Sequence, residues 1–488
     1  MHLATLITFV VYLIGLIILG IIAYRKTHDL ADYILGGRQL GSGVAALGVG
    51  ASDMSGWLLL GLPGALYASG LNQIWIALGL IIGAYLNWLL VAKRLRIDTE
   101  QANNALTIPE FLQARFQARS LRVVSALVIL IFFTFYVASG LVSSATLFEN
   151  SFGLNYTIAL WISVLIIMGY TFIGGFLAIS WADVFQGLLM LLALLIVPIV
   201  AIVELGGWNS TTQIITYLQP TSLEPLHDMT LLEIISLMAW GLGYFGQPHI
   251  LARFMAIKSV QAIPNARRIA MTWMIASLGG AVLTGLVGIA YFANNPLEDP
   301  EEVFLVLSQV LFNPWIAGIL LAAVLSAIMS TVDAQLVVAS SALTDDFYRA
   351  FLSPHASQPQ LVWIGRLAVI GVTMVALIIA QNPDSTILDL VGYAWAGFGS
   401  SFGPVIIFSL FWPSMTRNGA LAGLFSGAIM VVLWRYLTDQ GIIPFSLYEM
   451  VPAFILSSIA IVVVSWLDGN LFSTLKGDRR GFLRKLGY

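Results

Sequence analysis

Long apolar stretches, separated by short polar ones, recur from one end of the chain to the other. Each is about 20 residues or longer, the length that an α-helix needs to cross the hydrocarbon core of a bilayer. The short alternating strands of a membrane β-barrel are absent from the sequence. The pattern therefore predicts an all-α polytopic membrane protein with about thirteen transmembrane helices, at residues 4–24, 43–68, 72–92, 122–147, 156–177, 183–205, 231–252, 270–292, 314–342, 361–381, 388–412, 418–437 and 448–467.

Composition agrees with this prediction and excludes several classes of protein. Of 488 residues, 59% are hydrophobic and 10% are charged, whereas soluble domains carry about 25% charged residues. The net charge of −3 gives no indication of nucleic-acid binding, and the lack of cysteine excludes disulfides and thiol catalysis. Arg25 and Lys26 follow the first apolar run rather than precede it, so we expect a retained span and not a cleaved signal peptide.

Basic residues concentrate in alternate loops. All but Arg435 lie at 25–38, 93–122, 253–268, 349–366, 417 and 476–485, whereas the other loops are neutral or acidic, as at 294–302. Cytoplasmic loops carry an excess of Lys and Arg. The alternation therefore predicts that the N-terminus lies outside and the C-terminus inside the cell.

Two of the predicted spans, the second and the seventh, are interrupted by glycine and proline. Transporters built from inverted repeats carry such interruptions at corresponding positions of the two halves. We therefore expect a five-plus-five arrangement with discontinuous spans 2 and 7. Its parts are a first span and loop at 1–42, a first repeat of spans 2–6 at 43–205, a second repeat of spans 7–11 at 206–412, and two final spans with a short tail at 413–488.

The second span carries an acidic residue, Asp53, near its middle. A carboxylate at mid-membrane costs at least ~2.5 kcal/mol, and such residues usually mark a functional site. Gly48, Gly50, Gly56 and Pro63 weaken the helix around it. The segment indicates a partly unwound span whose carbonyls and carboxylate face a small polar ligand. The alternative is a tightly packed span whose Asp53 pairs with a structural partner.

Hydroxyl groups mark the ninth predicted span. Ala327, Ser330 and Thr331 are spaced i, i+3 and i+4, so they share one helix face. Their oxygens suit a small hard cation, although Ser and Thr in membrane helices also bond across packing interfaces. Asp333 either neutralises a cation that leaves inward or pairs with a basic loop residue, and we favour the second interpretation.

Aromatic residues flank both interruptions, and two charges lie near predicted cytoplasmic turns. Trp57 follows Gly56, Trp240 and Tyr244 surround Gly241 and Gly243, and Tyr136 lies midway along the fourth span. A pocket for a compact, partly apolar solute needs such walls, whereas most membrane tryptophans are interfacial. Arg38 and Asp183 are either ordinary interfacial charges or part of an ion route.

Signals for an enzyme are weak. The five histidines are scattered, with no HExxH motif, and no GxxxxGK[ST] loop is present to bind ATP. We expect a secondary transporter, driven by an ion gradient, with no organic cofactor and no obligate protein partner. A membrane enzyme would need a convergent acid/base or metal cluster, and a channel or sensor would need a continuous pore or an output domain.

Several long strings resemble one family of transporters. They are DYILGGRQLG (32–41), GASDMSGWLLLGLPGALY (50–67), NNALTIPEF (103–111), TFIGGFLAISWAD (171–183), WGLGYFGQPHILARFMA (240–256), FNPWIAGILLAAVLSAIMST (312–331) and YAWAGFGSSFGP (393–404). On these motifs the chain resembles the solute:sodium symporter family, in its bacterial proline-transporting branch. The resemblance implies a LeuT-type core and Na+-coupled uptake of L-proline across the bacterial cytoplasmic membrane by alternating access.

The resemblance also implies roles for individual residues. It places Na+ between backbone oxygens of Ala51 and Met54 and ligands at Ala327, Ser330 and Thr331, with Asp53 essential for the action of Na+. Ser55, Gly56 and Trp57 are expected to bind or gate proline, and Tyr136, Trp240, Tyr244 and Pro248 to form the proline pocket. Arg38 and Asp183 are expected to assist ion entry or release on the cytoplasmic side. The alternative is a Na+- or H+-coupled symporter of another small solute on the same fold.

Overall fold

The computed structural model describes residues 3–24, 34–381, 386–443 and 447–485 of the chain. Within these ranges the regular structure is helical, apart from one β-bridge between Leu40 and Ile257. This confirms the predicted all-α class.

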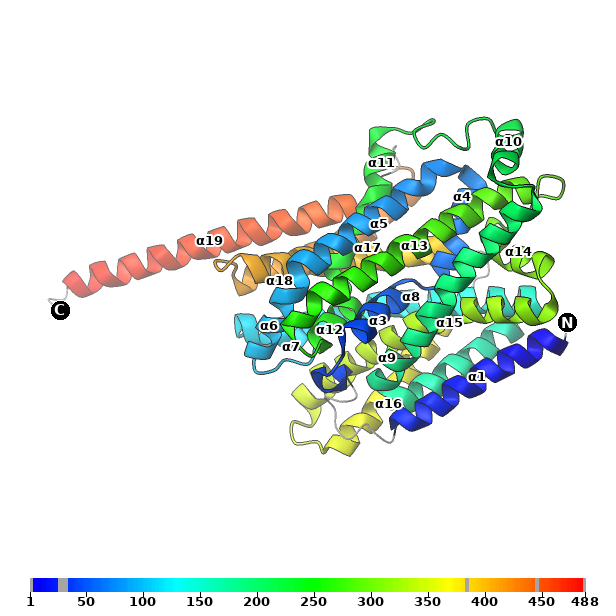
Figure 1. The fold of residues 1–488 in the computed structure, drawn as a ribbon. Coiled ribbons are helices and arrows are strands. Elements are labelled where there is room, and N and C mark those ends of the chain that lie inside the picture. Colours follow the sequence, from blue (N-terminus) through cyan, green and yellow to red (C-terminus); the bar gives the residue numbers. More distant parts are fainter. Residues whose placement is uncertain (1–2, 25–33, 382–385, 444–446, 486–488) are drawn as a thin grey trace.

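Eighteen α-helices are described, labelled as in Figure 1. They are α1 (Leu3–Tyr24), α3 (Ser42–Asp53), α4 (Leu62–Ser69), α5 (Ile74–Leu86), α6 (Ala92–Gln101), α7 (Ile108–Phe116), α8 (Arg119–Phe152), α9 (Tyr156–Glu204), α10 (Trp208–Leu218), α11 (Leu231–Met238), α12 (Pro248–Ala256), α13 (Ile263–Tyr291), α14 (Val303–Leu311), α15 (Pro314–Ser341), α16 (Gln358–Ile379), α17 (Ile387–Phe411), α18 (Arg417–Asp439) and α19 (Met450–Lys485). Short 3₁₀- or π-helical segments join them: η1 (Gly36–Arg38), η2 (Trp57–Gly61), η3 (Leu71–Gln73), η4 (Asn87–Val91), η5 (Ala239–Gly246), η6 (Val260–Ala262), η7 (Pro300–Glu302) and η8 (Ala342–Leu352).

Many of these helices are long and apolar enough to cross a membrane. Ten qualify among the described residues, and an eleventh is formed when Ser42–Asp53 and Trp57–Ser69, bent by 63°, are taken as one broken span. Two shorter apolar helices, Tyr156–Phe172 and Leu231–Gly246, are also described. The protein is thus a multi-pass membrane protein.

The loops gather at two opposite ends of the bundle. At one end, the backbone N–H of Leu71 donates to Ser222 O at 2.7 Å, and that of Leu297 donates to the Tyr67 hydroxyl at 3.0 Å. We call this end, which contains the loop 294–302, the acidic end. At the other, Arg96 Nε donates to Ile257 O at 2.6 Å; we call this the basic end.

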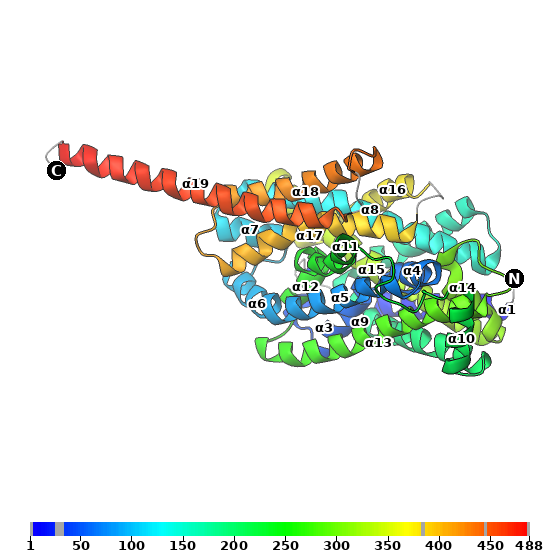
Figure 2. The same cartoon turned by 90° about the horizontal axis from the view of Figure 1, so that it is seen from above.

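The two ends of the chain also lie apart. The start of α1 and the end of α19 are at opposite ends of the bundle in both views (Figures 1 and 2). Thr5 of α1 bonds to Pro314 O at the start of α15, whereas Thr416, before α18, bonds to Asp468 of α19.

Helix α15 lies at the centre of the molecule. Its apolar window is 83% buried, against 22% for α1 and 28% for α18 and α19. It packs against α1, α3, α8, α9 and α16. Residues on α15 therefore meet several elements at once, whereas α1, α18 and α19 form the outside of the bundle.

Candidate functional site

The second predicted span is broken where the sequence analysis expected it. Helix α3 ends at Asp53, and the backbone of Met54 leaves the helical region with φ −83° and ψ 76°. A Cβ atom on Gly56 would lie 2.7 Å from Ser143 Oγ of α8. Glycine therefore lets the broken segment approach α8 closely before the helix resumes in η2.

Buried oxygens converge on the end of α3. Ser330 Oγ donates to Ala51 O at 2.7 Å and to Ala327 O at 3.1 Å, and Thr331 Oγ1 donates to Ala51 O at 3.3 Å. All four residues are buried, and Met54 follows at the break. The structure thus brings together two hydroxyls and two carbonyls from two helices, the oxygen ligands that a hard cation prefers.

Asp53 points its side chain toward the other broken span. The Tyr244 hydroxyl donates to Asp53 Oδ2, and Oδ1 has no hydrogen-bond partner in the described part of the chain. The Trp57 indole N–H donates to Asp53 O at 3.3 Å. Because the carboxylate is only 2% exposed, its free oxygen is unpaired deep inside the protein. Buried polar groups are usually satisfied, so this oxygen indicates a ligand.

The seventh predicted span is interrupted as well. It runs as the 3₁₀ segment η5, becomes extended at Gln247 (φ −77°, ψ 109°), and restarts as α12 at Pro248. A Cβ on Gly241 would lie 2.1 Å from Gly79 O, and one on Gly243 would lie 1.9 Å from the Trp395 indole. Only glycine permits this approach to α5 and α17.

Aromatic rings line the space between the breaks. The Trp57 and Trp240 ring centroids are 6.4 Å apart, Tyr448 stacks on Trp240 at 5.4 Å, and Tyr244 meets Trp395 edge-on at 5.2 Å. Tyr136 and Trp57 are almost fully buried. These tryptophans are therefore core residues and not members of an interfacial belt.

Two polar residues at the second break escaped the sequence analysis. Gln247 and His249 are fully buried. Gln247 Nε2 donates to Trp395 O at 3.2 Å, but Gln247 Oε1 and both ring nitrogens of His249 lack partners among the described residues. The Tyr136 hydroxyl, beside Ser55, also lacks a well-formed hydrogen bond within the same ranges. The available signal was a polar residue immediately before Pro248.

The remaining predicted pocket residues frame this space. Trp57 N lies 3.5 Å from Ser55 Oγ, at the limit of a hydrogen bond. Pro248 is the first residue of α12 and lines a cavity of about 20 Å³ on the side toward the basic end. The predicted pocket residues of both broken spans are therefore close together, whereas Arg38 and Asp183 lie elsewhere.

Arg38 and Asp183 are not ordinary interfacial charges. Arg38 donates to Met255 O at 2.7 Å and to Ala105 O at 2.6 Å, and burial, followed by the nearby Arg96, lowers the pKa of Arg38 to about 10. Asp183 lies within helix α9, fully buried, in an ion pair of 2.6 Å with Arg253. Its placement at a cytoplasmic turn stays a prediction. Arg253, the partner, was not predicted.

Asp333 also corrects an expectation. We favoured a pair with a basic loop residue, but Asp333 is buried at depth and its Oδ1 accepts a hydrogen bond from the Thr171 hydroxyl of α9. Because α15 is central, this side chain faces α9 rather than a loop. Its Oδ2 has no partner in the described ranges.

Comparison with known proteins identifies the family. The sequence profile of the sodium:solute symporter family matches residues 33–427. The chain belongs to the sodium:solute symporter family. It is 54% identical over 470 residues to the sodium/proline symporter of Escherichia coli K12, which covers 95% of this chain and 93% of that relative. It is 52% identical to the high-affinity proline transporter PutP of Bacillus subtilis 168, with 93% and 96% covered.

Solved structures of symporters share this fold. A Na+-coupled sialic acid symporter, in a substrate-bound outward-open state, matches with a TM-score of 0.82 at 18% identity, covering 96% of this chain and 98% of that one. Mhp1, a nucleobase-cation-symport-1 family transporter, matches with a TM-score of 0.55 at 15% identity. At these identities the likeness establishes the fold alone. Family members are transporters, not enzymes.

Proposed function

We propose that this chain is a Na+-coupled symporter that imports L-proline across the bacterial cytoplasmic membrane by alternating access. The observation that carries the proposal is the meeting of two broken spans, where Tyr244 of one contacts Asp53 of the other. The sodium/proline symporters among its relatives, up to 54% identical over nearly the full chain, support both the ion and the solute.

The sodium site lies at the end of α3. Its ligands are Ala51 O, Ala327 O, Ser330 Oγ and Thr331 Oγ1, with the carbonyl of Met54 at the break and Asp53 close by. Neutral oxygens with one nearby carboxylate suit a monovalent cation, because Ca²⁺ sites draw on several carboxylates and Mg²⁺ sites keep waters. Na+ displaces the hydroxyl hydrogens that now point at Ala51 O.

The proline pocket lies between the two breaks. Proline is a zwitterion with a compact apolar ring, so it needs a partner for its ammonium, a donor for its carboxylate and apolar walls. The free oxygens Asp53 Oδ1 and Gln247 Oε1 are acceptors for the ammonium, and the Tyr136 hydroxyl is a donor for the carboxylate. The remaining wall is formed by Ser55, Gly56, Trp57, Trp240, Tyr244 and Pro248.

Coupling follows from the contact between the sites. Asp53 belongs to the span whose end holds Na+, and Tyr244 belongs to the span that holds the solute. If Na+ fixes the end of α3, the carboxylate of Asp53 is held where it can accept hydrogen bonds from both the Tyr244 hydroxyl and the ammonium of proline. By linkage, proline then tightens Na+ binding by the same factor as Na+ tightens proline binding.

The proposed topology has thirteen spans and a five-plus-five inverted-repeat (LeuT-type) core. The eleven long or bent spans plus Tyr156–Phe172 and the broken Leu231–Ala256 segment make thirteen. Helix α9 has 49 residues, and its two apolar parts, Tyr156–Phe172 and Ala178–Glu204, are counted as two spans. Breaks in spans 2 and 7 agree with one discontinuous helix in each repeat.

Orientation follows from the basic end. Because cytoplasmic loops are rich in Lys and Arg, we place the basic end inside, with the N-terminus outside and the C-terminus inside. Arg38 and the Asp183–Arg253 pair lie on the ion route toward this end. The membrane potential then drives inward Na+ with about 2.3 kcal/mol per charge per 100 mV, and the chemical gradient adds to it.

Uptake into proteoliposomes tests the proposal. Purified protein is reconstituted and radiolabelled L-proline uptake is measured under an inward Na+ gradient, with an equal K+ gradient as control. We expect accumulation only with Na+, abolished when the gradient is collapsed. Equal uptake under both gradients would overturn Na+ coupling. If neither gradient drives uptake, Na+-dependent thermal stabilisation by another small solute would replace proline on the same fold. Proline uptake driven by a proton gradient would instead replace Na+.

A further inference from the structure

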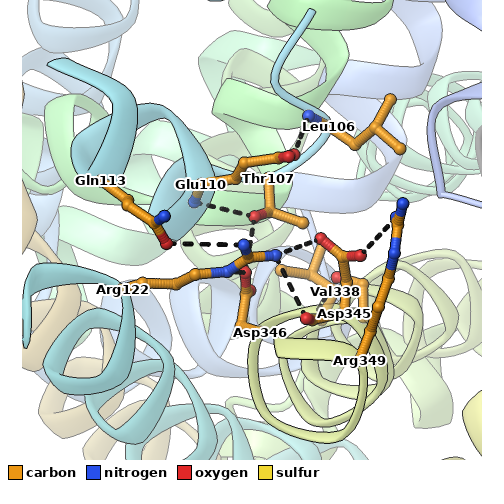
Figure 3. Close-up of polar contacts among 10 residues, drawn as sticks. Leu106, Thr107, Glu110, Gln113, Arg122, Val338, Asp345, Asp346 and Arg349 are labelled. Atoms are coloured by element: carbon orange, nitrogen blue, oxygen red, sulfur yellow. Dashed lines mark hydrogen bonds and ion pairs between the residues drawn. The ribbon is translucent and has the colours of Figure 1, made fainter. Parts of the chain in front are cut away.

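A buried ionic cluster closes the basic end of α15, separate from the sodium and proline sites. Arg122 of α8 contacts two adjacent acids of η8, Asp345 Oδ2 at 2.5 Å and Asp346 Oδ1 at 2.6 Å. Thr107 donates to the same Asp346 oxygen at 3.1 Å. Figure 3 shows the arginine between the acids and the start of α7. We call Arg122, Asp345, Asp346 and Thr107 the Arg122 cluster.

The two acids of the cluster are as deeply buried as the central site, and Arg122 is mostly buried. The side chain of Arg122 is 12% exposed, and those of Asp345 and Asp346 are 1% and 0% exposed. Breaking a buried ion pair by removing one partner is strongly destabilising, because a charge is left unpaired. The contacts of Arg122 therefore hold η8 firmly against α7 and α8.

A small cavity separates the cluster from the proposed proline pocket. Its volume is about 20 Å³, and Asp346 and Thr107 line it together with Pro248 and Ala252 of α12 and Ser341 of α15. Asp346 Oδ2 has no partner in the described part of the chain. The cavity thus has α12 on one wall and the Arg122 cluster on another. It is too small for an amino acid.

On the other side of the cluster is a wider opening. A cavity of about 280 Å³ is lined by Arg122, Asp345 and Arg349 together with Arg119, Glu110 and Phe351. Arg122 and Asp345 line the wide cavity, whereas Asp346 lines the small one. The cluster is therefore the partition between the surface at the basic end and the interior beside Pro248.

We propose that the Arg122 cluster is the seal on the solute's exit route, and that solute release requires Arg122 to part from Asp345 and Asp346. The proposal rests on the proposed function in taking the basic end as the exit and Ser330 as a ligand of Na+. Arg122 acts through the position of η8 and does not contact Na+ or proline.

The seal is connected to the sodium site through one helix. Asp345 and Asp346 lie in η8, which continues α15 without a break, and α15 carries Ser330 and Thr331. A tilt of α15 that follows loss of Na+ at Ser330 therefore also moves the two acids. The unpaired Asp346 Oδ2 gives the ammonium of the leaving solute its first acceptor beyond Pro248.

Thiol labelling tests the seal directly, because the chain contains no cysteine. Ser341 is 3% exposed and lines the small cavity, so Ser341→Cys is a conservative reporter. A membrane-impermeant maleimide is added to inside-out and right-side-out vesicles. With Na+ present and no proline, we expect slow labelling of Ser341→Cys from either side. Adding Arg122→Gln should raise the labelling rate about tenfold or more in inside-out vesicles only, since it removes the cation that pairs with both buried acids.

Arg349→Gln is the matched control. Arg349 also pairs with Asp345, at 3.0 Å, but its side chain is 43% exposed, and such surface pairs contribute little. We expect its labelling rate to equal that of Ser341→Cys alone. Equal rates in the Arg122→Gln and Arg349→Gln backgrounds would overturn the seal, whatever solute the protein carries.

A second variant covers a failure of Arg122→Gln to fold. Asp346→Asn keeps the shape of the side chain and weakens one contact, so it should raise labelling by a smaller factor. The melting temperature and size-exclusion profile of each variant, compared with those of Ser341→Cys alone, serve as the folding check. A folded Asp346→Asn protein with unchanged labelling would also contradict the proposal.

Discussion

Both broken spans free backbone groups that need partners, but different kinds of residue surround the two breaks. At the first, α3 ends beside a charged residue, and its last carbonyls are met by hydroxyls of α15. At the second, the described side chains nearest the break are aromatic or amide groups, such as Tyr244 and Gln247, and the segment is enclosed by Trp395. One break is suited to a cation and the other to a compact solute.

Under the proposed function, this difference places the two ligands at separate breaks that are joined by one contact. A helix break in a membrane is tolerated only where protein or a watery cavity satisfies the freed backbone groups. Here α15 supplies oxygens to the first break, and α5 and α17 supply backbone and ring contacts to the second. Tyr244 is the one described residue of the second break that bonds to Asp53 of the first.

The largest effect is expected from removing the charge at the first break. Asp53→Asn should raise the Na+ concentration for half-maximal proline uptake by about 100-fold, because charged hydrogen-bonding groups contribute ~1.5–3 kcal/mol. Membrane expression should change little. The matched control is Asp439→Asn, an exposed acid whose ion pair is with Arg435. Unchanged Na+ affinity in Asp53→Asn would remove the assigned difference between the breaks.

Cutting the link between the breaks should have the next largest effect. Tyr244→Phe keeps the ring against Trp395 but removes the hydroxyl that donates to Asp53. We expect about tenfold weaker coupling, seen as a smaller shift of proline affinity between high and low Na+. Isothermal titration of proline at several Na+ concentrations measures it. A full shift in this variant would mean that another contact carries the coupling.

A hydroxyl at the first break should matter less than the carboxylate. Thr331→Val preserves shape and removes one oxygen that faces Ala51 O at 3.3 Å. One neutral hydrogen-bonding group contributes about 1 kcal/mol, so Na+ affinity should fall about fivefold with proline affinity at saturating Na+ unchanged. Thr331→Ser, which keeps the hydroxyl, should restore affinity. A loss of proline affinity at saturating Na+ would instead place Thr331 in the solute pocket.

Gln247, at the second break, should affect the solute and not Na+. Gln247→Leu removes the unpaired Oε1 but keeps a side chain of similar size. We expect the KM for proline to rise about threefold to tenfold with the Na+ dependence unchanged. Gln247→Glu is the companion variant, because it keeps an acceptor oxygen. If both substitutions leave the KM unchanged, Gln247 bonds only to Trp395 and not to the solute.

Much of this arrangement was predictable from the sequence. Glycine and proline inside apolar spans predicted both breaks, and the spacing of Ala327, Ser330 and Thr331 predicted one shared helix face, because these signals are local. The partner of a buried charge is not local. Arg253 is 70 residues from Asp183, and Thr171 is 162 residues from Asp333, so no local pattern favours them over loop residues.

The same limit applies to polar residues without a charge. Gln247 and His249 carry no pattern that separates a ligand contact from a packed side chain, and the structure distinguishes them by the hydrogen bonds that they lack. The thirteen-span count and the inverted repeats remain predictions. The expected all-helical membrane fold and the family are confirmed.

The smallest effect concerns a carboxylate that connects the surroundings of both breaks. Glu301 accepts hydrogen bonds from the backbone N–H groups of Ile387 and Leu388 at 3.1 and 3.2 Å, at the start of α17. Its backbone also packs on Gly64, beyond the first break. Burial raises the pKa of Glu301 from 4.5 to about 6, although the two N–H groups oppose the rise.

A raised pKa means that the folded state binds the proton more tightly than the unfolded state. Glu301 should therefore add stability below about pH 4.5, and this contribution should be lost as the pH rises through about 6. Glu301→Gln should remove the dependence. We expect the melting temperature of the wild type, relative to Glu301→Gln in the same detergent, to fall by a few degrees between pH 5 and pH 7. A constant difference over this range would contradict the assignment.

Because η8 is wound as a π-helix, the continuous helix formed by α15 and η8 has a second possible motion besides tilting, which is rewinding of η8. A π-helix closes its hydrogen bonds over five residues, one more than an α-helix, and such turns are found mostly in short pieces at functional sites. Rewinding Ala342–Leu352 as an α-helix, which has fewer residues per turn, turns Asp345 and Asp346 about the helix axis while Ser330 stays in place. We expect such torsion of η8 to add to a tilt of α15 in separating both acids from Arg122.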